Sequence, residues 1–161
     1  MITLVLVRHA KSDWGDPALA DHDRPLNARG MHDAPVMAFR LHERILEGTT
    51  PMPEVILSST AVRARTTAEA FAAELDAAVS LDEELYGAPA GTLLRKAARA
   101  RAHCVMVVAH DPGMSELAAS LSDDGVSAMP TCAVATFTWG TDDWDVATAV
   151  PPASWSLDTP R

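Results

Sequence analysis

The clearest structural signal lies near the start of the sequence, in the stretch Ile2-Thr3-Leu4-Val5-Leu6-Val7. Arg8 and His9 follow it directly. A short apolar run rich in β-branched residues is typical of a strand buried inside a sheet. A second run of this kind, from Cys104 to Ala109, is followed by His110. The two runs therefore predict two buried strands, each of which is followed by a histidine.

Helical and strand patterns alternate along the rest of the chain. Such alternation predicts an α/β fold, a three-layer αβα sandwich with a mostly parallel central sheet. Cap residues and apolar spacing predict helices over residues 28–46, 61–75, 91–101 and 112–121, and further strands at 55–57, 79–81, 133–139 and 144–150.

The length of 161 residues suits one domain, which we expect to cover residues 1–161. Residues 151–161 hold three prolines, and we expect them to form a tail that is either loose or lies along the surface. No apolar run approaches the roughly 18 residues of a membrane span. The run at residues 2–7 is also too short for the core of a signal peptide, so we expect a cytoplasmic protein that is a monomer.

The formal net charge of −9 argues against a nucleic-acid partner, which would require a basic face. If the substrate is an anion, its positive partners must be placed locally. Cys104 and Cys132 are expected to be buried, reduced thiols, and no cysteine or histidine cluster has the spacing of a zinc site.

Three predicted strands end in residues that carry chemistry. The first ends at Arg8 and His9, the second is followed by Arg63 one turn into a helix, and the third ends at His110. In an open α/β sheet, ligands bind beyond the carboxyl ends of the strands. A neutral imidazole can attack phosphorus, and arginine forks fit phosphoryl oxygens, so this edge predicts a phosphate site.

Four segments resemble the histidine phosphatase superfamily, which includes the cofactor-dependent phosphoglycerate mutases. Alanine in the third position of the Arg-His-Gly signature is similar to the SixA-like phosphohistidine phosphatase branch. The match covers most of the chain in order and spacing. The segments are Leu6-Val7-Arg8-His9-Ala10, Asp23-Arg24-Pro25-Leu26-Asn27-Ala28-Arg29-Gly30, Ser58-Ser59-Thr60-Ala61-Val62-Arg63-Ala64-Arg65-Thr66-Thr67-Ala68 and Val107-Val108-Ala109-His110-Asp111-Pro112-Gly113.

The resemblance implies a phosphoglycerate mutase-like fold and a hydrolase that works without a metal or other cofactor. His9 would be the phosphorylated nucleophile, Arg8 and Arg63 would hold the phosphoryl oxygens, and His110 would complete the pocket. Three positions depart from the family pattern: Thr60 for proline, Ala109 for glycine and Asp111 for asparagine. Asp111 would either weaken anion binding or orient His110.

The proton donor of many relatives has no clear counterpart here. Glu83 and Glu84 are the nearest candidates, although a solvated surface role fits them as well. Asp13, Asp16 and Asp23 on the early loop are further candidates. An alkyl ester needs its leaving oxygen protonated, whereas a neutral imidazole leaves readily, so a missing donor favours phosphohistidine.

The short connections also leave no room for a helical lid, which predicts an open pocket. The substrate is therefore expected to be a phosphorylated protein or, alternatively, a small phosphorylated compound. The alternatives are a phosphomonoesterase acting on a small metabolite and a phosphate-binding module without catalysis.

Overall fold

The computed structural model describes all 161 residues and contains one six-stranded sheet of order β3-β2-β4-β1-β5-β6. The predicted α/β class is confirmed. No helix combines the length and the apolar character needed to cross a membrane. The elements are β1 (Ile2–Arg8), the 3₁₀ helix η1 (Asp21–Asp23), α1 (Ala28–Leu46), β2 (Val55–Ser58), α2 (Val62–Leu75), β3 (Val79–Leu81), the 3₁₀ helix η2 (Glu83–Leu85), α3 (Ala90–Arg99), β4 (Cys104–Ala109), α4 (Gly113–Leu121), β5 (Val134–Trp139), α5 (Trp144–Ala147) and β6 (Ser154–Asp158).

Strands β3, β2, β4 and β1 run parallel, while β5 and β6 pair antiparallel at one side. In the pairing of β1 with β4, Thr3 lies opposite Cys104 and Arg8 lies opposite Ala109. The residues that follow Arg8 and Ala109 therefore leave the sheet side by side. This register brings His9 and His110 to the same edge.

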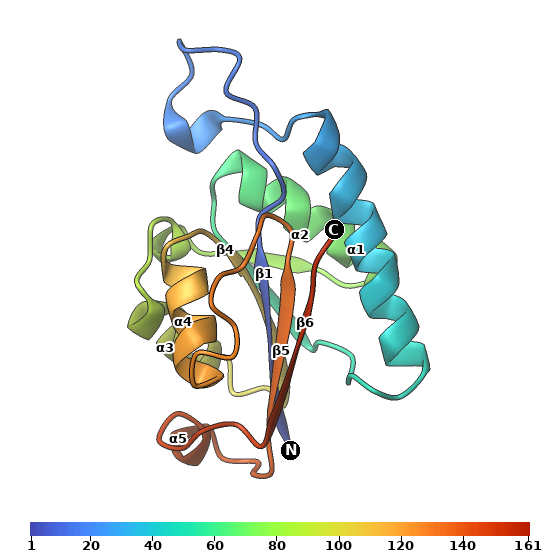
Figure 1. Cartoon of the computed structure of the whole chain (residues 1–161), viewed down its shortest axis with the longest axis vertical. Helices are drawn as coiled ribbons and strands as arrows, with labels where there is room; N and C mark the ends of the chain where they lie inside the picture. Colours follow the sequence, from blue (N-terminus) through green and yellow to red (C-terminus); the bar gives the residue numbers. More distant parts are fainter.

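The side chains of β1 alternate between two apolar cores. Leu4 and Leu6 pack on the face covered by α3 and α4, and Val5 and Val7 pack on the face covered by α1 and α2. Figure 1 shows the sheet between these two helix layers. The three-layer arrangement is therefore as predicted, and a strand buried on both faces explains the continuous apolar run at its start.

Residues 144–150 do not form the predicted strand. Trp144–Ala147 is the short helix α5, whose first turn is capped by the Asp143 side chain accepting a hydrogen bond from the N–H of Asp145. The indole N–H of Trp144 donates to the carbonyl of Ala102 at 2.7 Å, and the ring is buried. Capping and burial of this tryptophan outweigh the alternating pattern.

Residues 151–161 are neither a loose tail nor a segment that merely lies along the surface, because they include an edge strand of the sheet. Ser154–Asp158 forms β6, which pairs antiparallel with β5. The carboxylate of Asp158 accepts hydrogen bonds from Arg40 and Arg44, and Arg161 forms a two-pronged ion pair with the buried Asp33. Ion pairs to α1, which the sequence pattern does not reveal, hold this end of the chain.

The connection between β1 and α1 rises above the carboxyl ends of the strands (Figure 1). Its base is closed by a bridge between Ser12 and Leu26, and Asn27 caps α1 by accepting from the N–H of Gly30 at 2.9 Å. Gly30 lies so close to this connection that an added Cβ would meet the carbonyl oxygen of Lys11 at 2.2 Å. A glycine is therefore required where α1 meets the loop.

Replacing Gly30 with alanine should destabilise the protein by roughly 2 kcal/mol, because the methyl group overpacks a backbone contact. Within a helix the same change would normally stabilise, so the sign tests the contact. Urea unfolding measures it, with Gly140→Ala as the control because nothing lies within 4 Å of a Cβ added there. A more stable Gly30→Ala variant would contradict the packing described.

Candidate active site

A pocket of about 220 Å³ opens beyond the carboxyl ends of β1 and β4. Four cationic side chains and one carboxylate line it together with His9. The chain as a whole is strongly acidic, so this local excess of positive charge is what an anion would meet. The lining residues are Arg8, His9, Lys11, Ser12, Trp14, Asp21, Arg24, Arg63 and Thr131.

His9 follows β1 directly, and its backbone N–H continues the strand pairing to the carbonyl of Ala109 at 3.1 Å. Its Nδ1 lies 2.7 Å from the carbonyl oxygen of Ala10. A carbonyl oxygen only accepts, so Nδ1 carries the proton and Nε2 keeps its lone pair. Burial lowers the pKa of His9 to about 4, and nearby Arg63 and Arg8 act in the same direction. The ring is therefore neutral at pH 7.

His110 stands beside His9, with ring centroids 5.1 Å apart. Its Nε2 lies 2.8 Å from the hydroxyl of Ser59, which closes β2. Burial is the main cause that lowers the pKa of His110 to about 3, and the proximity of His9 and of Arg63 acts in the same direction. Its Nδ1 is buried without a hydrogen-bond partner in the protein.

Arg8 and Arg63 reach the pocket from β1 and from the first turn of α2. Nη1 of Arg8 donates to the carbonyl of Met129 at 2.9 Å, whereas its buried Nε has no partner in the protein. Thr67 ties the two elements together, since its hydroxyl accepts from the N–H of Ala10 and donates to the carbonyl of Arg63. Nε of Arg8 and Nδ1 of His110 are thus both buried without a partner in the protein, and His110 stands behind His9 rather than in the lining of the pocket.

Arg24 is a third pocket arginine that the sequence analysis did not assign a role. It is 5% exposed, and its guanidinium donates to the Ser12 hydroxyl, to the Asp13 carbonyl at 3.1 Å and to Asp21 at 2.8 Å. It also stacks on Trp14, 3.1 Å from the ring centroid. Only the folding of the loop back on itself places Arg24 here, so no spacing rule could have found it.

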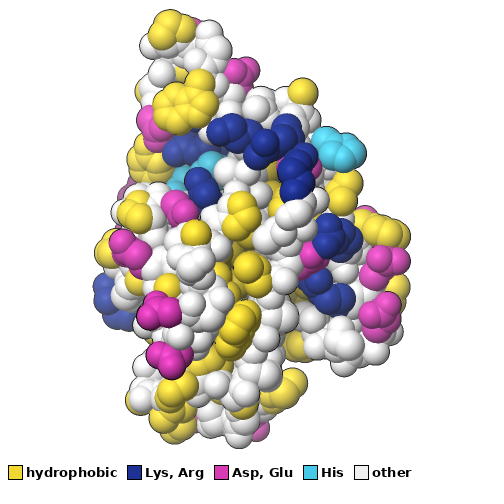
Figure 2. Space-filling view, viewed as in Figure 1, with side chains coloured by type: hydrophobic (Ala, Val, Ile, Leu, Met, Phe, Trp, Pro, Cys, Tyr) yellow, Lys and Arg dark blue, Asp and Glu magenta, His cyan; other side chains and the backbone are white.

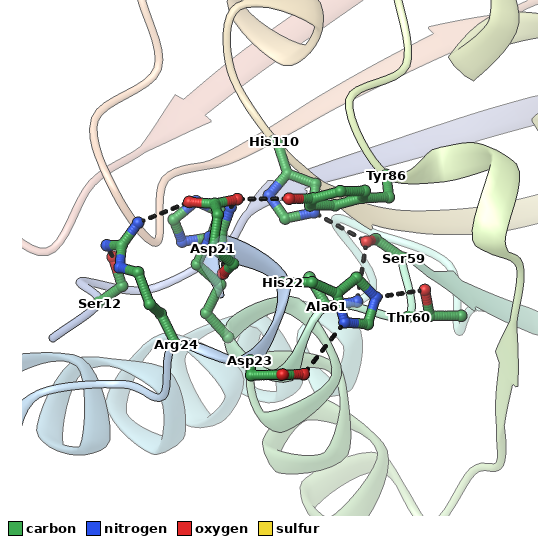
Figure 3. A network of polar contacts seen from close by, with 12 residues as sticks. Ser12, Asp21, His22, Asp23, Arg24, Ser59, Thr60, Ala61, Tyr86 and His110 are labelled. Atoms are coloured by element: carbon green, nitrogen blue, oxygen red, sulfur yellow. Dashed lines mark hydrogen bonds and ion pairs between the residues drawn. The ribbon is translucent and has the colours of Figure 1, made fainter. Parts of the chain in front are cut away.

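Asp21 is the one carboxylate that lines the pocket, and the sequence analysis also missed it. Figure 3 shows it between Arg24 and Tyr86. It accepts hydrogen bonds from Arg24, from Nη2 of Arg63 at 2.9 Å and from the Tyr86 hydroxyl. Tyr86 and then Arg63 hold the pKa of Asp21 well below its usual range, so this carboxylate is ionised at neutral pH.

The structure does not bring the two proposed glutamates into the pocket. Glu84 forms an ion pair with Lys96 at 2.6 Å, and both Glu83 and Glu84 are exposed. Asp13, Asp16 and Asp23 are likewise exposed and do not line the pocket. The reason lies in η2, whose turn directs Tyr86 rather than an acid toward Asp21.

Asp111 lies behind Arg8 rather than in the pocket. One of its oxygens is 3.3 Å from Nη1 of Arg8, and the carboxylate accepts hydrogen bonds from the N–H and hydroxyl of Ser115. His22, on the loop before α1, contacts the Thr60 hydroxyl at 2.8 Å and packs edge-on against Tyr86. No three His, Cys, Asp or Glu side chains gather in a way that could hold a metal ion.

The sequence and the fold together identify the class. Residues 4–95 match the family model of the histidine phosphatase superfamily (branch 1). An uncharacterized chloroplastic protein of Arabidopsis thaliana is 31% identical, over 96% of this chain and 75% of that protein. An uncharacterized protein of Mycobacterium tuberculosis is 37% identical, over 72% of this chain and 70% of that protein. The chain therefore belongs to the histidine phosphatase superfamily.

A solved structure from Agrobacterium tumefaciens, assigned as the phosphohistidine phosphatase SixA, has a similar fold. It superposes with a TM-score of 0.75 at 28% identity, covering 98% of this chain and 96% of that one. The predicted SixA-like branch and the phosphoglycerate mutase-like fold are thus confirmed. The chain is a hydrolase of the kind that uses a histidine nucleophile to remove phosphate.

The low pKa of His9 makes stability depend on pH. In the unfolded chain His9 takes up a proton near pH 6.5, whereas in the folded protein it does so only near pH 4. The free energy of unfolding therefore decreases as the pH falls from 6.5 toward 4. His9 alone contributes a decrease of roughly 2 kcal/mol between pH 6.5 and 5. Urea unfolding of His9→Asn should show a shallower decline than the wild type, because asparagine does not titrate.

The control is His103→Asn, at a histidine whose side chain is 66% exposed. This variant should keep the full decline of the wild type. Equal slopes for His9→Asn and the wild type would show that His9 is not held neutral by burial.

Proposed function

We propose that the protein is a phosphohistidine phosphatase that works without a metal, through a phosphoryl group carried on Nε2 of His9. The observation that carries this proposal is the hydrogen bond from Nδ1 of His9 to Ala10, which leaves Nε2 as a free nucleophile. Three arginines surround the position where a phosphoryl group would meet that nitrogen. Mere phosphate binding would not require a histidine fixed in this tautomer.

The reaction proceeds in two displacements. The lone pair of Nε2 forms a bond to phosphorus while the bond from phosphorus to the leaving atom breaks, and that atom keeps the electron pair. Arg8, Arg63 and Arg24 share the charge on the phosphoryl oxygens, assisted by His110. The oxygen of a water molecule then forms a bond to phosphorus while the bond from phosphorus to Nε2 breaks and its electron pair returns to Nε2. The proton lost by that water passes to the phosphate oxygens or to solvent, and inorganic phosphate and neutral His9 are released.

The protonation state of Asp21 determines which leaving groups the site can accept. The single pocket carboxylate is held ionised by Tyr86, Arg63 and Arg24, so it has no proton to give. An alkoxide leaving from a sugar or a serine needs a proton, and an acid in place supplies about 10²–10⁴-fold in rate. A protonated phosphoimidazole instead leaves as neutral imidazole. The site therefore suits a phosphorus–nitrogen bond.

The pocket opening suits a phosphorylated side chain on a protein. Only the short 3₁₀ helix η1 contributes to this side of the pocket, through Asp21, and Trp14 in the lining is 70% exposed. A second candidate, a phosphomonoesterase for a small metabolite, would require a proton donor that the pocket residues do not provide. The proposed roles of His9, Arg8, Arg63 and His110 are the same in both cases.

The proposal predicts a sharp preference among substrates. Without added metal, the wild type should dephosphorylate a histidine-phosphorylated protein at least 100-fold faster than an alkyl phosphate such as glycerol phosphate, because only the alkyl leaving group needs an acid. His9→Ala should lose activity on both substrates. Release of inorganic phosphate under single-turnover and steady-state conditions measures these rates.

His103→Ala is the matched control, since this exposed histidine precedes β4 at the opposite edge of the sheet. It should keep full activity. Retained activity in His9→Ala would refute the covalent mechanism. Fast alkyl turnover by the wild type would instead favour the metabolite phosphatase and show that a proton donor acts in the pocket.

Arg24 provides a second test of the pocket. Arg24→Ala should weaken the binding of inorganic phosphate and lower kcat/KM by roughly 10–100-fold, because a charged hydrogen-bond donor is lost. Arg24→Lys should recover little, since an ammonium group cannot reproduce the fork that contacts Ser12 and Asp21. Calorimetric titration with phosphate measures binding directly, and unchanged affinity in Arg24→Ala would exclude Arg24 from the phosphate site.

A further inference from the structure

A second pocket lies at the other end of the molecule. It has a volume of about 230 Å³ and lies between the end of α3 and α5. The hydrogen bond from Trp144 to Ala102 fixes α5 against the segment that follows α3. The lining residues are Leu94, Arg95, Ala98, Arg99, Arg101, Asp145 and Thr148.

The three arginines of this pocket are unusual in the chain because they form no ion pair. Acidic residues outnumber basic ones by 22 to 13, and nine of the 13 Lys and Arg side chains lie within 4.0 Å of a carboxylate. The remaining four are Lys11, Arg95, Arg99 and Arg101. Lys11 lines the pocket of His9, so every unpaired cation of this protein borders one of two pockets.

Arg101 has a backbone conformation that is uncommon for an arginine. Its φ of 56° lies in the left-handed region, which glycine or asparagine adopts more readily just after a helix. Stabilisation of a helix end by cations accounts for Arg99 in the last turn of α3. It does not account for Arg101, which lies beyond the helix and lines the same pocket.

The chemistry of the pocket defines its ligand. Three exposed arginines and one carboxylate, that of Asp145, line the pocket, so two positive charges are in excess. Guanidinium forks bind phosphate oxygens in pairs. Leu94 and Ala98 supply a small apolar floor, and no aromatic ring is present on which a nucleotide base could stack. We propose that this pocket is a second anion site that binds a small compound with two phosphate groups, of the size of pyrophosphate.

This site is separate from the one that holds His9. Arg101 precedes the amino end of β4, whereas His110 follows its carboxyl end, and six strand residues between them span about 20 Å. In Figure 1, α5 lies at the opposite end of the sheet from the loop that rises over His9. A ligand in the second pocket therefore does not occupy the place of the substrate.

The test uses methylenediphosphonate, which resembles pyrophosphate but has no cleavable bridge. Titration calorimetry at about 0.15 M ionic strength should reveal two binding events in the wild type. Arg95→Ala/Arg99→Ala should weaken one of them at least tenfold and leave phosphatase activity unchanged. Alanine favours helices, so α3 should remain folded. Arg63→Ala should remove the other event only.

Amide chemical shifts show where in the protein each ligand molecule binds. The event lost in Arg95→Ala/Arg99→Ala should move the signals of Ala98 and Thr148, and the control Arg65→Ala should change neither event. Arg65 lies on α2 and pairs only with Glu69. A single event that disappears with Arg63→Ala, or unchanged signals at Ala98 and Thr148, would overturn the second site. Because binding is measured, an inactive enzyme would refute the proposed function without affecting this result.

Discussion

The parallel pairing of β1 with β4 is the constraint on which the site depends. Because Arg8 lies opposite Ala109, the next residue of each strand leaves the sheet at the same height, and the rings of His9 and His110 stand 5.1 Å apart. A shift by one residue would turn one ring into an apolar core. The two cores that alternate along β1 therefore fix the register, and through it the active site.

Around this pair, four cationic side chains line the pocket of a protein whose net charge is −9. Figure 2 shows Lys and Arg side chains gathered with histidine on the upper part of one face, while the surface below them is mixed. Burial and the arginines both favour the neutral form of His9, and the Ala10 carbonyl selects its tautomer. Tyr86, and then Arg63 and Arg24, lower the pKa of Asp21 and keep this carboxylate ionised, so two of the arginines that favour neutral His9 also keep the pocket carboxylate from holding a proton. This arrangement supports the proposal that the substrate carries a leaving group that needs no acid.

Much of this architecture could be predicted from the sequence, because it depends on local patterns. Apolar runs predicted the buried strands. The residues at the strand ends predicted that His9, Arg63 and His110 would lie at the same edge of the sheet. Arg24, Asp21 and Tyr86 were missed because loop contacts, not spacing, bring them together. The tail was misjudged for a similar reason, since ion pairs of Asp158 and Arg161 with α1 hold β6. The cytoplasmic location and the monomeric state remain predictions.

Trapping the intermediate is the most direct test of whether Nε2 of His9 carries the phosphoryl group. A protein with ¹⁵N-labelled histidine would be mixed with a phosphoramidate and examined by ¹⁵N and ³¹P NMR. We expect one phosphohistidine, at His9, with phosphorus bound to Nε2 and the proton retained on Nδ1 facing Ala10. Phosphorylation at Nδ1, or at any residue other than His9, would contradict the mechanism.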